Sequence, residues 1–443
     1  MTDTPFADAL AHFAASPLAG ADTAREVLRL SLLDWCAVAI AGRQEPVAQV
    51  LRALAEDEGG VPQAHAIGMA ILVPARMAAL VNGTLSHALD YDDTHFAHIG
   101  HPSVAVIPAA LAMAERVGAS GRAMQEAALV GVEASVRTGV WLGRGHYQAG
   151  FHQTATAGAI GAGLAAGRLL GLSAAELADV IGLLGTRASG LKSQFGTMGK
   201  PFNAGIAAAN GVEAALLVSL GFDPRRAGLE GPQGLGPTHH GAGDMGALEG
   251  LGQSWRFEEV SHKFHACCHG LHAALEAVAG LLPVDPDGIS AIEVVTHPRW
   301  LTVCNIAAPA TGLEAKFSYA QVMALAALGH DTARLDSYTD ALARAPEVVA
   351  LRGWVDVTSD DRLAESAAIV RLTVNGESRE ATHDLLAPLP LATRAAKLQA
   401  KAEALLGSDA VARLSGLVTE NAAPGEIGAA LQVFCRSGQL DMS

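Results

Sequence analysis

The densest run of ionisable side chains is the segment SHALDYDDTHFAHIGHPS, residues 86–103, which separates two apolar stretches. Carboxylates and imidazoles that lie together can move protons to and from a bound molecule. If the preceding helix runs on through the first half of this segment, His87, Asp90 and Thr94 lie on one face at i, i+3 and i+7, with Asp93 beside them. The spacing therefore predicts a group of acid/base side chains on one helical face.

Two other interpretations of this segment stay open. In the first, the segment is a solvated loop that ends at Pro102, and Ser103 caps the following helix. In the second, His95, His98 and His101 lie three residues apart next to two aspartates, 92 and 93, and hold a metal ion. The glycine and proline beside the third histidine argue against the turn-by-turn regularity that such a metal site needs.

Two further polar clusters follow along the chain. The segment GHYQAGFHQTATAG places His152 at the start of a Gly/Ala-rich helix, with Thr156 one turn further on the same face. In GLKSQFGTMGKPFNAG, Lys200 stands before a proline at a helix start and Asn203 follows, which is typical of an anion site. The alternative for Lys192 and Lys200 is a surface turn, where most lysines lie.

A fourth cluster, KFHACCHGLH at residues 263–272, combines a lysine, three histidines and two cysteines. Adjacent cysteines rarely share one ligand sphere, so we interpret Cys267 and Cys268 first as small buried groups. The chain has five cysteines and no Cys-x-x-Cys pair. This pattern indicates neither a disulfide framework nor a thiolate-held metal centre.

The composition limits the classes of protein that this chain can belong to. With 50% hydrophobic residues among 443, it has enough apolar material for a large core and is not a disordered protein. Its formal net charge of −15 repels a nucleic-acid backbone, so an anionic substrate must meet a few locally gathered cations. The first residues do not resemble a signal peptide, and the most apolar segments are shorter than the ~20 residues of a spanning helix. We therefore expect a cytoplasmic protein with neither a nucleic-acid nor a membrane partner.

The spacing of apolar residues predicts how the elements are ordered. Three- and four-residue spacing from about 21 to 220 predicts successive helices, and the Gly-rich residues 222–260 predict a long connection that could form a pocket wall. Beyond residue 285, ISAIEVVTH, WVDVTSD and AAIVRLTVNGESREATH predict strands, the last with an Asn-Gly hairpin turn. We expect a mainly α protein with an α+β insert, divided into a helical domain (1–268), an α+β lid domain (269–390) and a return to the helical domain (391–443).

Several of these motifs together resemble the MmgE/PrpD family, in the family's order and over nearly the whole chain. They are HALDYDDTH, HPS, G-x-H-x-T, GTM-x-KP, the helix AAANGVEAAL that follows it, and EAKFS. The family comprises 2-methylcitrate dehydratases, cis-aconitate decarboxylase and iminodisuccinate epimerase. The resemblance implies a large all-helical domain made from both ends of the chain, a smaller α+β lid domain inserted between them, a homodimer, and no metal or organic cofactor.

The resemblance also implies a set of site residues. The family's catalytic residues match Asp90, Thr94, His101, His152 and Lys200. The residues expected to bind substrate are Asp93, Lys192, Asn203, Lys263, Cys268, Lys316 and Gln321. Arg137 and Arg144 are further candidates for binding carboxylates, from charge alone. Asn203 and Gln321 depart from the family, where histidine and tyrosine are common at or near these places.

The chemistry shared within the family is proton movement at a carbon next to a carboxylate, which needs a base and a stabiliser of negative charge. We expect His101, His152 and Lys200 to supply these groups, while Asp90 and Thr94 orient them or the substrate. The sequence thus predicts a cofactor-independent lyase that dehydrates or decarboxylates a small anionic di- or tricarboxylate.

Three alternatives stay open at this point. The first is an epimerase or isomerase of an iminodisuccinate-like dicarboxylate, and the second is a non-catalytic helical scaffold. The third is a metal-dependent hydrolase that uses His95, His98, His101 and Asp93.

Overall fold

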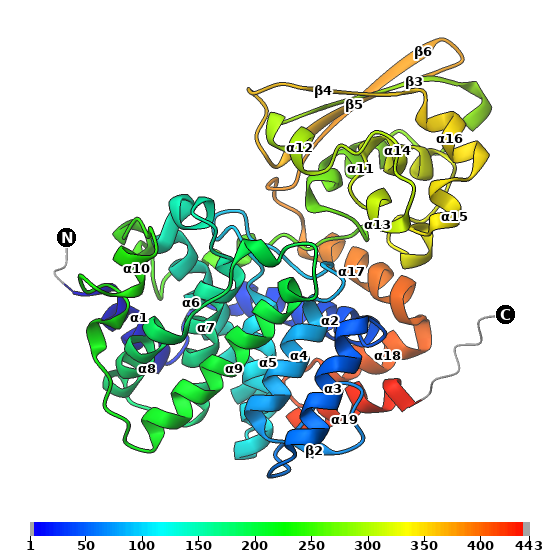
Figure 1. The fold of residues 1–443 in the computed structure, drawn as a ribbon. Helices are drawn as coiled ribbons and strands as arrows, with labels where there is room; N and C mark the ends of the chain where they lie inside the picture. The colour runs from blue at the N-terminus through cyan, green and yellow to red at the C-terminus, as the bar shows by residue number, and fades with distance from the viewer. Residues whose placement is uncertain (1–3, 437–443) are drawn as a thin grey trace. The chain divides into compact units, whose positions relative to one another are not determined.

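The computed structural model describes residues 4–436, and their contacts divide the chain into two units (Figure 1). The first unit contains the residues up to His262 and those from Leu406 onward, and the second is Lys263–Leu405. The sequence placed these boundaries at 268/269 and 390/391. The predicted fold class, mainly α with a smaller α+β part, is confirmed.

The first unit is built from helices of 10 to 28 residues. They are α1 (Phe6–Ala15), α2 (Asp22–Gly42), α3 (Pro46–Glu58), α4 (Ala75–His87), α5 (Ser103–Val117), α6 (Gly121–Gln148), α7 (Gln153–Leu169), α8 (Ala174–Arg187), α9 (Gly199–Ser219), α18 (Ser408–Leu417) and α19 (Pro424–Arg436). Two short strands, β1 (Ala64–His65) and β2 (Leu72–Val73), form an antiparallel pair that the sequence did not predict.

Helices α4, α5, α7 and α9 pack against one another at the centre of this unit (Figure 1). Glycines let their backbones approach closely. A Cβ added to Gly83 on α4 would lie 3.0 Å from the Cα of Gly205 on α9, so only small residues fit at this crossing. The Gly/Ala-rich segments therefore serve close helix packing.

Local signals fix where several of these elements begin. Ser173 and Glu176 form the predicted capping box at the start of α8, with each side chain bonded to the other residue's backbone N–H. The Gly-rich residues 222–260 form, as predicted, a connection with short helical pieces. These are η2 (Arg226–Gly228), α10 (Leu235–Thr238), η3 (Met245–Leu248) and η4 (Arg256–Glu259).

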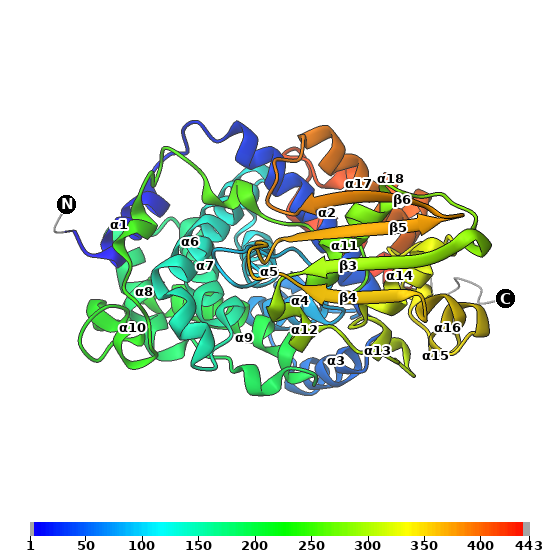
Figure 2. The ribbon, with the colours of Figure 1, turned by 90° about the horizontal axis from the view of Figure 1, so that it is seen from above.

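The second unit has a four-stranded sheet with the order β4-β3-β5-β6, which Figure 2 shows side by side. The strands are β3 (Ile289–Thr296), β4 (Val355–Ser359), β5 (Ala367–Val374) and β6 (Glu377–Asp384). β3 and β4 run parallel, and the other neighbours are antiparallel. The predicted hairpin is present, because Val374 pairs with Glu377 across Asn375 and Gly376.

Helices α11 and α14 of the second unit pack against this sheet. The helices of the unit are α11 (His272–Ala279), α12 (Pro298–Val303), α13 (Gly312–Ala315), α14 (Tyr319–Ala327), α15 (Asp340–Ala343), α16 (Pro346–Arg352) and α17 (Leu391–Leu406). Its single-turn helices are η5 (His269–Leu271), η6 (Pro286–Gly288) and η7 (Leu335–Ser337). The contacts place nearly all of α17 in this unit, so α18 and α19 make the return to the helical one.

Among the described helices, α9 alone has the length and apolar character of a membrane span, yet 67% of its most apolar stretch is buried. It packs against α4, α5 and α7, which is the ordinary situation of a core helix. The four cysteines whose side chains are described, at 36, 267, 268 and 304, form no disulfide bond. The fifth, Cys435, lies outside the described side chains.

Candidate active site

The chain leaves α4 earlier than the sequence predicted. The helix ends at His87, and Asp90 adopts a left-handed backbone conformation with φ 51°, which a short polar side chain tolerates better than most. His87, Asp90 and Thr94 therefore do not share a helical face, and that prediction was wrong. The turn at Asp90 instead lets several carboxylates and imidazoles of one loop converge.

A buried carboxylate links two histidines in this loop. Asp92 Oδ1 accepts a hydrogen bond of 2.9 Å from His87 Nδ1, and Asp92 Oδ2 lies 2.7 Å from His101 Nδ1. Asp92 is 2% exposed. Burial by itself would raise the pKa of Asp92, but the two imidazoles bring it well below the usual value for aspartate. Asp92 is therefore an ionised carboxylate that accepts a hydrogen bond from His87 and makes a close charge contact with His101.

Lys200 meets this loop from α9. Its Nζ lies 2.7 Å from Asp90 Oδ2, and Asp90 Oδ1 lies 3.5 Å from His101 Nε2. The Lys200 ammonium also stands 5.3 Å from the centre of the Phe195 ring. The side chain of Asp90 is 35% exposed and that of Lys200 is 18% exposed, so the charged network reaches solvent at these two residues.

His152 is the residue directly before α7 and lies beside the same network. Its ring stacks 5.8 Å from the ring of His87, while the His87 and His101 rings are 4.6 Å apart. Burial lowers the pKa of His152 well below that of an ordinary imidazole, and the nearby Lys200 ammonium acts in the same direction. His152 is therefore a neutral imidazole at neutral pH.

Asn203 supports His152 from α9. Its side-chain nitrogen lies 3.3 Å from His152 Nδ1 and 3.3 Å from the carbonyl oxygen of Leu191. Asn203 is 4% exposed, so this residue, expected to bind substrate, holds a histidine in place.

Asp93, which the resemblance places among the substrate-binding residues, pairs with Ser103. Its carboxylate accepts a bond of 2.5 Å from the Ser103 hydroxyl and one of 3.3 Å from the Ser103 backbone N–H. Burial raises the pKa of Asp93 to about 7. The hydrogen bond from Ser103 lowers this pKa, whereas the nearby carboxylate of Asp34 raises it further. The Ser103 side chain therefore does not cap α5, because it donates to Asp93. The Asp93 carboxylate holds the start of α5 against the preceding loop.

Thr94, expected to be catalytic, is paired with the end of the long connection. Its backbone exchanges hydrogen bonds of 2.9 and 2.7 Å with Ser261, and its hydroxyl lies 3.4 Å from the Ser261 carbonyl oxygen. On α7, the hydroxyl of Thr156 lies 2.9 Å from His146 Nε2. As predicted, the helix starts beside His152 and places Thr156 one turn further on, but the Thr156 hydroxyl contacts His146.

The alternative metal site of His95, His98 and His101 is not assembled among residues 4–436. His95 Nε2 contacts the Arg256 carbonyl oxygen at 2.9 Å, and His98 packs against Gly139 of α6. Burial lowers the pKa of His98 to about 3. Both rings are therefore neutral supports of the loop.

Within residues 4–436, one group of side chains has ligand atoms close enough for a metal ion, within 4.8 Å of one another: His87, Asp90, Asp92 and His101. Both imidazoles already direct Nδ1 to Asp92, and the Lys200 ammonium already lies on Asp90. Protein cations and N–H groups thus balance both carboxylates, and the group is better described as a hydrogen-bonded network than as a metal centre.

Arg137 lies inside the first unit and pairs with Glu133. It is fully buried, donates from Nε to Glu133 at 2.6 Å, and donates to the carbonyl oxygens of Ala247, Glu249 and Ser254. Glu133 in turn accepts from two backbone N–H groups of η4. The pair anchors the long connection to α6, and the Arg137 guanidinium is used by groups of the protein itself. Arg144 lies exposed near the end of α6.

Lys192 has another partner within the first unit. Its Nζ donates to the Tyr147 carbonyl oxygen at 3.1 Å and stands 3.8 Å from the centre of the Tyr147 ring. This contact ties the short helix η1 (Lys192–Gln194) to the end of α6.

The remaining expected residues belong to the second unit. The Cys268 backbone N–H donates to the Lys316 carbonyl oxygen at 2.9 Å, and Lys263 is buried near the Cys267 thiol. Gln321 is fully buried, with its side-chain oxygen accepting from Arg352 at 2.9 Å. Gln321 therefore stabilises the packing of α14 through its contact with Arg352.

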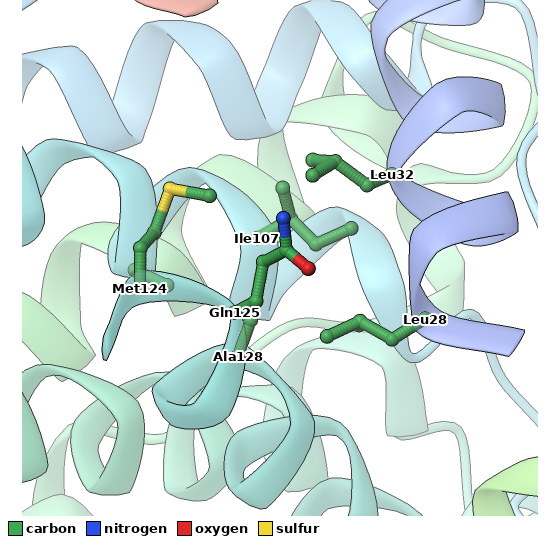
Figure 3. A pocket seen from close by; sticks show the side chains of 7 residues that line it. Leu28, Leu32, Ile107, Met124, Gln125 and Ala128 are labelled. Atoms are coloured by element: carbon green, nitrogen blue, oxygen red, sulfur yellow. The ribbon is translucent and has the colours of Figure 1, made fainter. Parts of the chain in front are cut away.

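The first unit also contains a small apolar cavity of about 10 Å³, shown in Figure 3, with the Gln125 side chain among apolar groups. A cavity of this size has room for about one water molecule. It is lined by Leu28, Leu32, Ile107, Ala110, Met124, Gln125 and Ala128. It is too small and too apolar to hold a carboxylate substrate.

The functional residues that the sequence prediction missed are His87 and Asp92 in their supporting roles. Both are at most 2% exposed, and His87 Nε2 has no hydrogen-bond partner among the described residues. The signal was present in the high density of Asp and His in residues 87–101, but which carboxylate faces which imidazole depends on the turn at Asp90.

Comparison with known proteins gives the family of this chain. The model of the MmgE/PrpD N-terminal domain matches residues 7–247, and that of the MmgE/PrpD C-terminal domain matches residues 265–410. The chain belongs to the MmgE/PrpD family, as its motifs predicted.

Curated relatives carry the name cis-aconitate decarboxylase. The enzyme from Aspergillus terreus is 32% identical over 219 residues, which cover 46% of this chain and 45% of the relative. The human enzyme is 32% identical over 171 residues, 38% of this chain and 35% of the relative. A cis-aconitate decarboxylase-like protein from Aspergillus oryzae is 29% identical over 290 residues, 61% of this chain and 60% of the relative. The chain thus spans less than two thirds of the length of these relatives.

Proposed function

We propose that this protein is a cofactor-independent lyase that acts on a small di- or tricarboxylate by moving a proton at a carbon next to a carboxylate. The reaction is a decarboxylation or a dehydration. The observation that carries the proposal is the chain of contacts from Lys200 through Asp90 to His101 and Asp92.

This chain of contacts suits a carbon acid. Removing a proton next to a carboxylate leaves negative charge on the carboxylate oxygens, which a nearby ammonium stabilises. Lys200 supplies that charge at the solvent-reaching end of the network, and His101 supplies an imidazole within reach of the same place. The network also supplies the local cations that an acidic protein needs to attract an anionic substrate.

The comparisons support a lyase more than an epimerase. Each of the relatives described above carries cis-aconitate decarboxylase in its name, whereas no specific feature of the site favours epimerisation. A hydrolase that uses the three-histidine cluster lacks the required geometry, since His95 and His98 are directed to the backbone of the fold.

The test is incubation of chelator-treated protein with a panel of di- and tricarboxylates in deuterated water, followed by NMR. We expect loss of a C–H signal, a new alkene or release of CO₂ from at least one member, at a rate that added metal does not change. Turnover that appears only after addition of a divalent metal would overturn the proposal. Inversion of a stereocentre without elimination would move the assignment to an epimerase.

A further inference from the structure

The hydrogen-bond partners of His152 define which of its two nitrogens carries the proton. The Leu191 carbonyl oxygen can only accept, so the atom of Asn203 that lies 3.3 Å from it is the amide nitrogen, a donor. The same nitrogen lies 3.3 Å from His152 Nδ1. His152 Nδ1 therefore accepts, and the proton of the neutral ring lies on Nε2.

The partner of His101 imposes the opposite arrangement. Asp92 is ionised and can only accept, and its Oδ2 lies 2.7 Å from His101 Nδ1. His101 therefore carries a proton on Nδ1, and its Nε2 is the nitrogen that gains or loses a proton. This Nε2 points to Asp90, the residue that also binds Lys200.

His87 keeps the Asp92 carboxylate in its orientation. Its Nδ1 donates to Asp92 Oδ1 at 2.9 Å. Its ring centre lies 4.6 Å from that of His101 and 5.8 Å from that of His152. Because both oxygens of Asp92 have an imidazole partner, the carboxylate cannot turn without losing one of them.

We infer that Asp92 and Asn203 are positioning residues that hold His101 and His152 in opposite tautomers and thereby divide the work between them. His101 takes up and returns the substrate proton through Nε2. His152 serves only as an N–H donor, to a substrate carboxylate or to the group that leaves. This division of roles rests on the proposed function, whereas the tautomers themselves do not.

The proton step is balanced within this arrangement. The proton leaves the substrate carbon for His101 Nε2, and the electron pair of the C–H bond spreads into the neighbouring carboxylate. Asp92 balances the charge of the imidazolium that forms, and Lys200 and the His152 N–H face the negative charge. In a dehydration, His101 then gives the proton to the departing hydroxyl, which leaves as water. In a decarboxylation, departing CO₂ instead leaves the electron pair of the C–C bond on the carbon, and the protonated Nε2 of His101 supplies the proton to that carbon. His152 stays neutral in both reactions.

The test is long-range ¹H–¹⁵N correlation NMR on protein with ¹⁵N-labelled histidine, with the signals assigned by His101→Gln and His152→Gln. In the parent, we expect the Nδ1–H tautomer or imidazolium for His101 and the Nε2–H tautomer for His152. Asn203→Asp replaces a donor with an acceptor and should move the His152 proton to Nδ1. Asp92→Asn introduces an amide that can donate and should release His101 from its Nδ1–H form.

Two further variants keep the test decisive. Asn203→Leu removes the donor without adding charge, in case the aspartate variant fails to fold, and it should leave a mixture of His152 tautomers. Asn210→Asp changes another buried asparagine of α9, one that pairs with Arg187, and should leave both tautomers unchanged. The inference is overturned if His101 and His152 show the same tautomer. It is also overturned if both tautomers are unchanged in Asp92→Asn and in Asn203→Asp.

Kinetics separate positioning from structural support. With any carboxylate that the protein turns over, Asp92→Asn should lower kcat by about 10²–10⁴-fold, the range for loss of an acid/base group or its tautomer, with KM within a few-fold. A similar loss from Asn210→Asp would point to a general structural effect instead. If the tautomers are as expected but no carboxylate reacts, the proposed function fails while the tautomer assignment stands.

Discussion

Lys200 Nζ lies 2.7 Å from Asp90 Oδ2, and this ion pair joins the start of α9 to the loop that follows α4. Both side chains remain partly exposed, which distinguishes them from the buried groups behind them. A substrate carboxylate that approaches the network would meet the Lys200 ammonium at its surface.

The first prediction concerns this pair. Lys200→Ala should lower kcat/KM by about 10²–10⁴-fold, because it removes the positive charge that stabilises the carbanion. Since Asp90 and Lys200 act as a unit, Asp90→Asn combined with Lys200→Ala should cost little more than the worse single change. Steady-state kinetics on the competent carboxylate measure this, with the exposed Arg122→Ala on α6 as a control. Turnover within a few-fold of the parent for Lys200→Ala would contradict the site.

The second prediction concerns the pH dependence of stability at Asp93. Burial raises the pKa of Asp93 from 3.8 to about 7, so between these values the folded protein holds a proton that the unfolded chain releases. The stability linked to this proton is present below pH 3.8 and is lost as the pH rises through 7. Between pH 3.8 and 7 the parent loses up to a few kcal/mol of its free energy of unfolding in this way, and Asp93→Asn should abolish that loss.

Thermal unfolding at pH 5 and pH 8 measures this effect. The Tm of Asp93→Asn minus the Tm of the parent should be larger at pH 8 than at pH 5. An effect of the amide that is the same at both values of pH cancels in this comparison. The exposed Asp409→Asn at the start of α18 is the control and should show no such change. A Tm difference that is equal at pH 5 and pH 8 would rule out the buried proton.

The third prediction concerns Arg137, which anchors the connection to α6. Arg137→Ala leaves Glu133 buried without its partner and should reduce the free energy of unfolding by about 3–5 kcal/mol. The segment from Met245 to Phe257 should become sensitive to limited proteolysis, because three carbonyl oxygens there lose their donor. Arg144→Ala, at an exposed position on the same helix, should change neither property.

The fourth prediction concerns the crossing of α4 and α9. A Cβ added at Gly205 would fall on Thr84 Oγ1 and the Leu80 carbonyl oxygen, so Gly205→Ala must push the helices apart. Overpacking of this kind costs about 1–3 kcal/mol and would also displace Lys200 and Asn203 on α9. The matched change Gly416→Ala meets no atom within 4 Å on α18 and should leave Tm unchanged or slightly higher. Equal Tm values for the two variants would contradict the close crossing.

The sequence by itself determined the order and type of most elements. Three- and four-residue apolar spacing predicts helices because the buried stripe of a helix repeats at that period, and the β-branched runs around Asn375-Gly376 predict the hairpin for the same local reason. The capping box at Ser173 and the helix start at Lys200 are also local signals, and the structure has both. The family could also be predicted from the sequence, because its motifs are short runs of consecutive residues.

Only the tertiary structure decided which ionisable groups work together. Asp92 and Asp93 are neighbours in the sequence with the same chemistry, yet Asp92 is ionised between two imidazoles while the pKa of Asp93 is raised to about 7. The difference arises from the left-handed turn at Asp90 and from the elements packed around each carboxylate. Arg137 shows the same limit, because its charge suggests ligand binding and only its burial beside Glu133 reveals an anchor. Side-chain partners far apart in the chain set protonation, and no local pattern of residues encodes them.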